Sequence, residues 1–184
     1  MNTLLRHSLK NLGFHQQHTG PQNNQPLKKQ QETVSQILPA EIVLPKRKSM
    51  KKKLLTVLEN SRNYTVAVAD AMPEKDYNSK VIKESWKFDD LLTHIGYGII
   101  WWNSNFIKNT KTEWEPPKTP ATKKAVIEYL SGAYDTLKET LENSEISDDV
   151  IYGFNATIDH VTHHRAQAVL FLRHTNITPP EYIY

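Results

Sequence analysis

The 184-residue sequence contains no cysteine. This absence excludes disulfide bonds, thiolate nucleophiles and thiolate metal ligands, so any metal site must be built from His, Asp or Glu. It also suits a cytoplasmic protein, because cytoplasmic chains rarely depend on disulfides. No stretch approaches the roughly 18–20 consecutive apolar residues that a membrane-spanning helix needs. We therefore expect a cytoplasmic, globular protein that makes no use of a membrane.

Acidic residues are scarce in the N-terminal quarter of the chain. Residues 1–49 hold seven of the 23 Lys and Arg residues but only two of the 20 acids, a net charge of +5, which leaves −2 for residues 50–184. The overall pI near 8.9 therefore reflects the first segment rather than the folded part. Because a nucleic-acid-binding domain concentrates basic charge on its folded surface, we expect no nucleic-acid partner.

The first segment is also poor in aliphatic residues. HQQHTGPQNNQPLKKQQ at 15–31 is polar and cannot bury enough apolar surface to offset the entropy of ordering it. Met50 then opens MKKKLLTVLENS, which resembles a natural start. The sequence predicts that residues 1–49 are a disordered or non-native extension, with a targeting segment as the alternative because MNTLLRHSLKNLGF is weakly amphipathic and free of acids. The folded domain is predicted to span residues 50–184.

From Met50 onward, apolar residues recur at the three- and four-residue steps of amphipathic helices. Four helices are predicted: from Met50 to about Ala71, from 85–87 to Phe106, from a Thr119 cap with Pro120 at the first helical position, and from a Ser147 cap through Asp148 to His174. No convincing pair of strands is present. The predicted fold class is all-α, a four-helix bundle with an N-terminal extension.

Glycine is rare, with six residues in the chain, yet Gly96 and Gly98 both lie inside the second predicted helix. Glycine in a helix interior costs about 1 kcal/mol relative to alanine. Two glycines at this place therefore indicate close packing against a neighbour or access for a ligand.

The run DHVTHHRAQ at 159–167 holds three of the eight histidines. His160 and His164 are four positions apart, so on a helix they share a face with Cβ atoms about 5–6 Å apart and can chelate one divalent ion. His163 points roughly 100° away from His164 and is expected to be solvated or to support its neighbours. Such a pair alone is a weak signal, because histidine pairs also occur on helix surfaces and in cores.

His94 is the best candidate for a third ligand, because it borders the apolar stripe of the second predicted helix. Three neutral imidazoles on two helices would leave one to three coordination positions open for water or substrate, as in catalytic sites. Imidazole suits Zn, Ni, Fe, Co or Cu, so the ligand type cannot select the metal. The alternative is that the three histidines are partly buried and bonded to backbone or carboxylate groups without a metal.

Two polar neighbours are candidates for orienting these histidines. Asp90 lies one turn before His94 and is predicted to accept a hydrogen bond from it. Gln167 lies just beyond His164 and is predicted either to hold a ligand or water, or to make an ordinary bond between helices.

Aromatic residues lie on the His94 side of the second predicted helix. Together with Trp102, Phe106 and Trp114, Tyr97 and Trp101 can either pack in the core or line a substrate pocket beside the metal. Arg165 is expected to form a salt bridge or to stack on an aromatic ring rather than to touch substrate.

The two histidine-bearing segments carry a family resemblance. WKFDDLLTHIGYGIIWWN and DHVTHHRAQAVLFLRHTNITPPEY resemble the DinB/YfiT group of metal-binding four-helix bundles. The specific pieces are His94, the H-x-x-x-H-R-x-Q run from His160 to Gln167, and the closing LR…PPEY. Ala166 stands where such proteins often have glycine, a small change on a helix. The resemblance covers residues 50–184 and implies that His94, His160 and His164 are the metal ligands.

The resemblance also implies a function. The cofactor would be a divalent ion such as Zn, Ni, Mn or Fe, acting as a Lewis acid or lowering the pKa of a bound water or thiol. The expected reactions are hydrolase-like, or transfers that use a low-molecular-weight thiol, on a small molecule. The run lacks the Glu of H-E-x-x-H, which disfavours peptide hydrolysis. The alternatives are a non-catalytic, metal-stabilised binding or stress-response module, and a bundle that mainly self-associates; a homodimer is compatible with all three.

Overall fold

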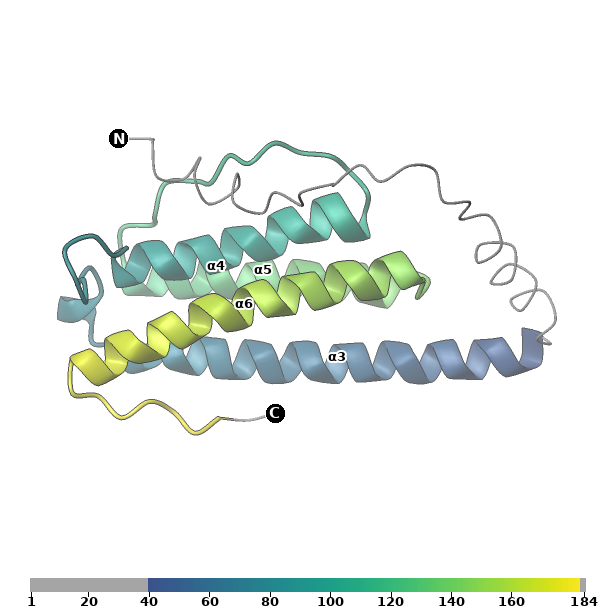
Figure 1. Ribbon diagram of the computed structural model, residues 1–184, viewed down its shortest axis with the longest axis horizontal. Coiled ribbons are helices and arrows are strands. Elements are labelled where there is room, and N and C mark those ends of the chain that lie inside the picture. The colour runs from purple at the N-terminus through teal and green to yellow at the C-terminus, as the bar shows by residue number, and fades with distance from the viewer. Residues whose placement is uncertain (1–39, 183–184) are drawn as a thin grey trace, which may run out of the picture. The chain divides into compact units, whose positions relative to one another are not determined.

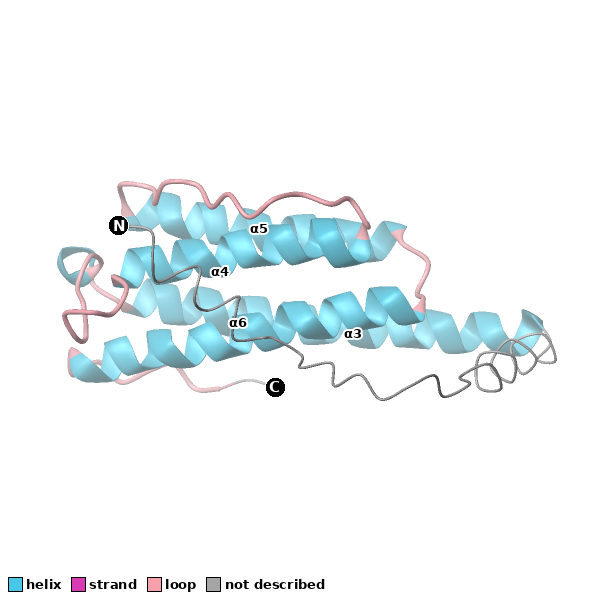
Figure 2. Ribbon diagram, turned by 45° about the horizontal axis from the view of Figure 1, so that its top comes forward, coloured by secondary structure: helices cyan, strands magenta, loops and turns pink. Residues whose placement is uncertain are grey.

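The computed structural model describes residues 40–182, and these residues contain helices and loops but no strand. The elements are α3 (Ala40–Ala71), the 3-10 helix η1 (Glu74–Asp76), α4 (Phe88–Trp102), the π-helical η2 (Asn103–Ile107), α5 (Lys123–Asn143) and α6 (Asp148–His174). The axes of the four long helices run in roughly the same direction in both views (Figures 1 and 2). The prediction of an all-α fold with four helices is confirmed.

Residues from Val43 onward belong to one compact unit. The predictions for residues 1–39 lie outside the described residues. α3 begins at Ala40, ten residues before the start predicted from the sequence. The sequence reasoning began this helix at Met50 because MKKKLLTVLENS resembles a natural start, but the Leu and Lys residues before Met50 also favour helix.

The interior is formed by the apolar faces of the four helices and of the loop before α4. The largest fully buried side chains are Tyr134, Phe88, Phe154, Met72, Leu91, Leu92, Ile95, Ile99, Leu130, Leu137, Leu141 and Leu172. Polar residues interrupt every helix on its outer side. None of the helices within residues 40–182 offers an apolar stretch long enough to cross a membrane.

A buried polar cluster joins α6 to α3 and α5. Arg165 is only 5% exposed, and its Nη1 donates to Ser61 Oγ and to Thr65 Oγ1, each at 3.2 Å. The Tyr134 hydroxyl lies 2.9 Å from the same Thr65 oxygen. The guanidinium also lies 5.1 Å from the centre of the Tyr64 ring. The expectation that Arg165 stacks on an aromatic ring is therefore confirmed.

Of the two helix caps predicted from the sequence, one is confirmed and the other is wrong. Ser147 caps α6 as predicted, because its hydroxyl accepts from the backbone N–H of Val150 at 3.2 Å. α5 begins at Lys123 and is capped by Thr122, so the predicted Thr119 cap is wrong. The helix starts three residues later because the loop that precedes it is held along α4 up to Thr119.

Candidate metal centre

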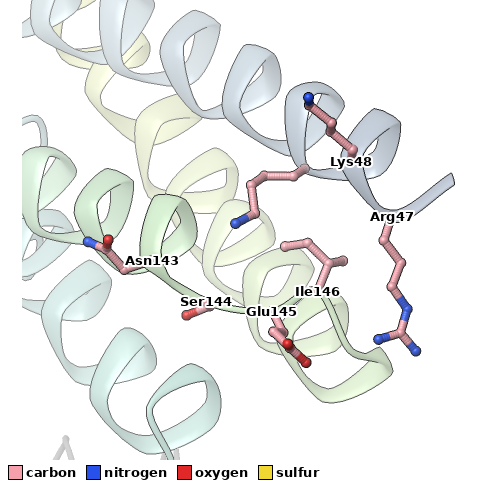
Figure 3. Close-up of a pocket in the computed structure, with 7 residues that line it drawn as sticks. Arg47, Lys48, Asn143, Ser144, Glu145 and Ile146 are labelled. Atoms are coloured by element: carbon pink, nitrogen blue, oxygen red, sulfur yellow. The ribbon is translucent and has the colours of Figure 1, made fainter. Parts of the chain in front are cut away.

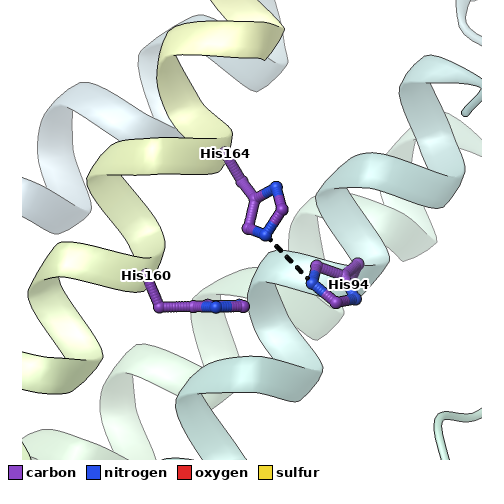
Figure 4. A group of neighbouring side chains, drawn as sticks. All are labelled: His94, His160 and His164. Atoms are coloured by element: carbon purple, nitrogen blue, oxygen red, sulfur yellow. Dashed lines mark hydrogen bonds between the residues drawn. The ribbon is translucent and has the colours of Figure 1, made fainter. Parts of the chain in front are cut away.

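α4 and α6 bring His94, His160 and His164 into one group (Figure 4). One ring nitrogen from each residue lies within 4.8 Å of the other two, which is the spacing that a single metal ion needs. Nε2 of His94 and Nε2 of His164 are 3.2 Å apart. The group forms because His160 and His164 occupy successive turns of one face of α6, and that face packs against the middle of α4.

Burial sets the charge of these imidazoles. Burial and the neighbouring His164 and His160 lower the pKa of His94 from 6.5 to about 3. The pKa of His160 falls to about 4, mainly through burial and also through His164, and burial lowers the pKa of His164 as well. All three rings are therefore neutral near pH 7. A neutral imidazole carries the free lone pair that a metal ligand requires.

The hydrogen bonding of the group is incomplete. Nε2 of His160 is buried and has no hydrogen-bond partner within the described part of the chain. A buried polar atom left in this way typically costs about 1–3 kcal/mol. Among residues 40–182, no backbone carbonyl or carboxylate bonds to any of the three rings, contrary to what the metal-free alternative requires. These residues therefore fit a divalent cation, which would satisfy all three nitrogens together.

Gln167 lies where it can orient one of the rings. Its Oε1 is 3.4 Å from Nδ1 of His164, and its Nε2 is 3.2 Å from Nε2 of His163. If Nδ1 of His164 donates to the amide oxygen, Nε2 of His164 is left unprotonated and faces His94. His163 is exposed and does not belong to the three-histidine group.

Tyr97 and Trp101 hold the 108–122 loop against α4. The Tyr97 hydroxyl accepts from the backbone N–H of Glu115 at 2.7 Å, and Trp101 Nε1 donates to the carbonyl of Thr112 at 3.1 Å. Tyr97 and Trp101 are four residues apart and so share one face of α4. Their polar atoms are engaged by the loop. That the two residues line a substrate pocket stays a prediction.

Asp90 is bonded to the same loop and not to a histidine. Its Oδ1 accepts from Thr119 Oγ1 at 2.5 Å, and within residues 40–182 it makes no hydrogen bond to His94. The prediction that Asp90 orients His94 is therefore wrong. The spacing placed Asp90 on the correct side of the helix, but Thr119 reaches its carboxylate from the loop, which the helical period could not indicate.

Two tryptophans form walls of the site: Trp114, which belongs to the predicted aromatic cluster, and Trp86, which the sequence reasoning did not assign to the site. The Trp86 ring lies 4.3 Å from that of His94 and stacks on that of His164 at 5.5 Å, measured between ring centres. Trp114, in the 108–122 loop, lies 5.5 Å from the His94 ring. The two indoles come from the loops on either side of α4. An aromatic residue in each flanking loop was the available signal, but the loop conformations could not be predicted from periodicity.

A separate hollow of about 730 Å³ lies between the N-terminal turns of α3 and the α5–α6 connection (Figure 3). It is lined by Arg47, Lys48, Lys51, Asn143, Ser144, Glu145 and Ile146. Nζ of Lys51 donates to the carbonyl of Glu142 at 2.8 Å, which satisfies a carbonyl at the end of α5. No histidine lines this hollow, so the group of neutral imidazoles remains the stronger candidate site.

No protein-family model matches the chain, and no curated protein matches it. The candidate site therefore depends on its own chemistry: three neutral nitrogen donors that can hold a divalent metal ion.

Proposed function

We propose that this chain is a divalent-metal-binding, DinB-like protein whose metal ligands are His94, His160 and His164. The observation that carries the proposal is the convergence of three neutral imidazole nitrogens within 4.8 Å. A nitrogen of His160 is also buried and has no hydrogen-bond partner among residues 40–182. The sequence motifs around these histidines provide the family part of the proposal. The metal would be Zn, Ni, Mn or Fe, since imidazole ligands alone do not choose among them.

We further propose that the site belongs to an enzyme of hydrolase or thiol-transferase type that acts on a small molecule. A divalent ion there would act as a Lewis acid and lower the pKa of a bound water or thiol. In the described region no carboxylate bonds to the three histidines, so reactions that need a dedicated general base are disfavoured. A substrate that brings its own ionisable donor, such as a low-molecular-weight thiol, suits the site better.

The side chains around the histidines support binding of a small molecule with an apolar part. Trp86 and Trp114 flank His94, and indole rings both exclude water and pack on apolar groups. His94, His160 and His164 are neutral and leave the charge of a divalent ion uncompensated. An anionic donor atom would therefore be favoured over a neutral one. Neither a nucleic acid nor a membrane is part of this proposal, whereas a homodimer is compatible with it.

The second candidate function is a non-catalytic, metal-stabilised binding or stress-response module. The observation that favours it is the packing of the Trp86 ring on both His94 and His164. If the indoles close every remaining coordination position, the ion can only stabilise the fold, as in structural metal sites.

The two functions are separated by loading tag-free protein with Co or Ni and adding a small thiol. The enzyme proposal expects the visible spectrum of the metal to change on thiol binding, and turnover in ester-hydrolysis or thiol-transfer screens. His164→Ala should abolish both signals, and His163→Ala, next to it on α6, should keep both. An unchanged spectrum without turnover, together with metal-dependent thermal stability, would support the binding module instead.

A further inference from the structure

The two glycines of α4, Gly96 and Gly98, make room for different neighbours. A Cβ atom placed on Gly98 would lie 2.2 Å from Nε2 and 2.6 Å from Cδ2 of His160. A Cβ atom on Gly96 would instead meet the Tyr129 ring of α5, at 2.9 Å from Cε1. Gly132, in the middle of α5, has nothing within 4 Å of the corresponding position. Of the four glycines that the structure describes, only Gly98 has the place of its missing side chain filled by a ring of the candidate metal centre.

Gly98 lies one turn after His94 on the same face of α4, because the two residues are four apart. The His160 imidazole occupies the space that any other residue at position 98 would fill with its Cβ atom. This close approach brings Nε2 of His160 to the α4 backbone, beside His94. A side chain at position 98 would have to push the ring away, since real Cβ contacts of 2.2 Å do not occur.

The movement would be confined to the imidazole. Nε2 is at the far end of the His160 side chain, and such an end can rotate while both helix backbones stay in place. An alanine at position 98 is thus compatible with the fold but not with the observed position of this ring.

We propose that Gly98 is a positioning residue of the metal centre, which holds His160 in its ligating orientation by lacking a Cβ atom. The proposal rests on the proposed metal-binding function, because it concerns one of the three ligands. It also gives a reason for a glycine inside α4, where alanine would favour the helix. The metal centre requires a glycine at position 98. At position 96 an added Cβ atom would meet Tyr129 and not a histidine.

The first test is metal affinity, measured by competition with a chelator, in wild-type protein and in Gly98→Ala. The proposal expects Gly98→Ala to fold but to bind Co or Zn about 10- to 100-fold more weakly, the usual effect of misorienting a ligand. The visible spectrum of bound Co should also change, because one nitrogen is lost from the coordination sphere. Gly96→Ala and Gly132→Ala are the matched controls and should keep the wild-type affinity and spectrum.

The second test uses metal-free protein, so that it does not depend on metal binding. In a His160→Ala background the space beside position 98 is vacant, and Gly98→Ala should raise Tm by about 2–4 °C through better helix propensity. In the wild-type background the same change should raise Tm less, because His160 must move. Equal gains in both backgrounds would overturn the contact between Gly98 and His160.

The outcomes separate the two proposals. Unchanged metal affinity and spectrum in Gly98→Ala would overturn the positioning role while leaving the metal centre in place. Absence of metal binding in wild-type protein would overturn the proposed function and the positioning role with it, even if the metal-free comparison still shows the contact.

Discussion

Two polar clusters lie on different faces of α6: the half-buried His164 belongs to one, and the adjacent, buried Arg165 belongs to the other. In the Arg165 cluster the guanidinium donates to oxygens of Ser61, Thr65 and Thr162. In the histidine cluster, His94 and His164 bond to each other, and Nε2 of His160 has no partner in the described chain. The Arg165 cluster is buried and the histidines are half-buried, but only the first cluster is satisfied by the described part of the protein.

A polar cluster whose hydrogen bonds are all made within the protein stabilises the fold, whereas a cluster with an unpaired donor atom can bind a ligand. Hydrogen-bond donors such as those of Arg165 can be matched by oxygens on neighbouring helices, and such a match fixes how α6 packs on α3. In the histidine cluster, His94 can pair only with His164, and Nε2 of His160 matches no group within residues 40–182. Folding alone gives little reason to bury them together, whereas a divalent cation gives all three a partner.

Removing the satisfied cluster should have the largest effect on stability. Arg165→Ala would leave Ser61 and Thr65 without their charged donor and would create a cavity beside Tyr64, so we expect a loss of about 3 kcal/mol in the free energy of unfolding. Denaturant unfolding measures this loss. The metal content of the folded protein should stay unchanged, because Arg165 faces α3 rather than α4. Loss of metal from well-folded Arg165→Ala would show that the two clusters are not independent.

Lowering the pH should destabilise the protein through the histidine cluster and not through the Arg165 cluster. The loss of stability should be smaller than that caused by Arg165→Ala. The pKa values of His94 and His160 are lowered from 6.5 to about 3 and about 4 on folding, so the unfolded chain takes up protons first as the pH falls. The stability of metal-free protein should therefore be full above pH 6.5 and decline from there towards pH 4. We expect a loss of about 1 kcal/mol per histidine at pH 5, allowing for solvent screening.

The comparison for this pH effect is metal-free His94→Ala, whose stability should decline less between pH 7 and pH 5. The Arg165 cluster contains no histidine, so it should contribute nothing to the slope. Equal slopes for wild-type protein and His94→Ala would contradict the burial of neutral imidazoles.

The smallest effect is expected at Gln167, which contacts the histidine cluster without joining it. Gln167→Ala removes the acceptor 3.4 Å from Nδ1 of His164 and should weaken metal binding by about 10-fold, with little change in stability. Titration calorimetry with Zn measures the change. A full loss of metal, or no change at all, would show that the amide does not act by orienting His164.

The helical period predicted the parts of the site that lie on helices. It indicated His160 and His164 by their spacing on α6, and His94 by its place on the apolar side of α4. The structure groups these three residues together. Ser147 was found for the same reason, because a cap is a local feature of the sequence next to its helix.

The parts supplied by loops could not be predicted in this way. Asp90 was assigned to His94 because both lie on one side of α4, but Thr119 of the 108–122 loop reaches the carboxylate. Trp86 and Trp114 approach His94 from the two flanking loops, and a loop has no period that fixes where its side chains point. Gly98 was noticed as an unfavourable helix residue, but its partner became visible only when α6 was placed against α4.

The most direct test of the central claim is the metal content of tag-free protein, measured by plasma mass spectrometry on wild type, His94→Ala, His160→Ala and His163→Ala. The account predicts nearly one metal ion per chain in wild type and in His163→Ala, and almost none in the other two, with all four proteins folded. The contrary result is a wild-type protein that binds no metal even after reconstitution with Zn, Ni and Mn. The three histidines would then be a buried polar cluster without a cation.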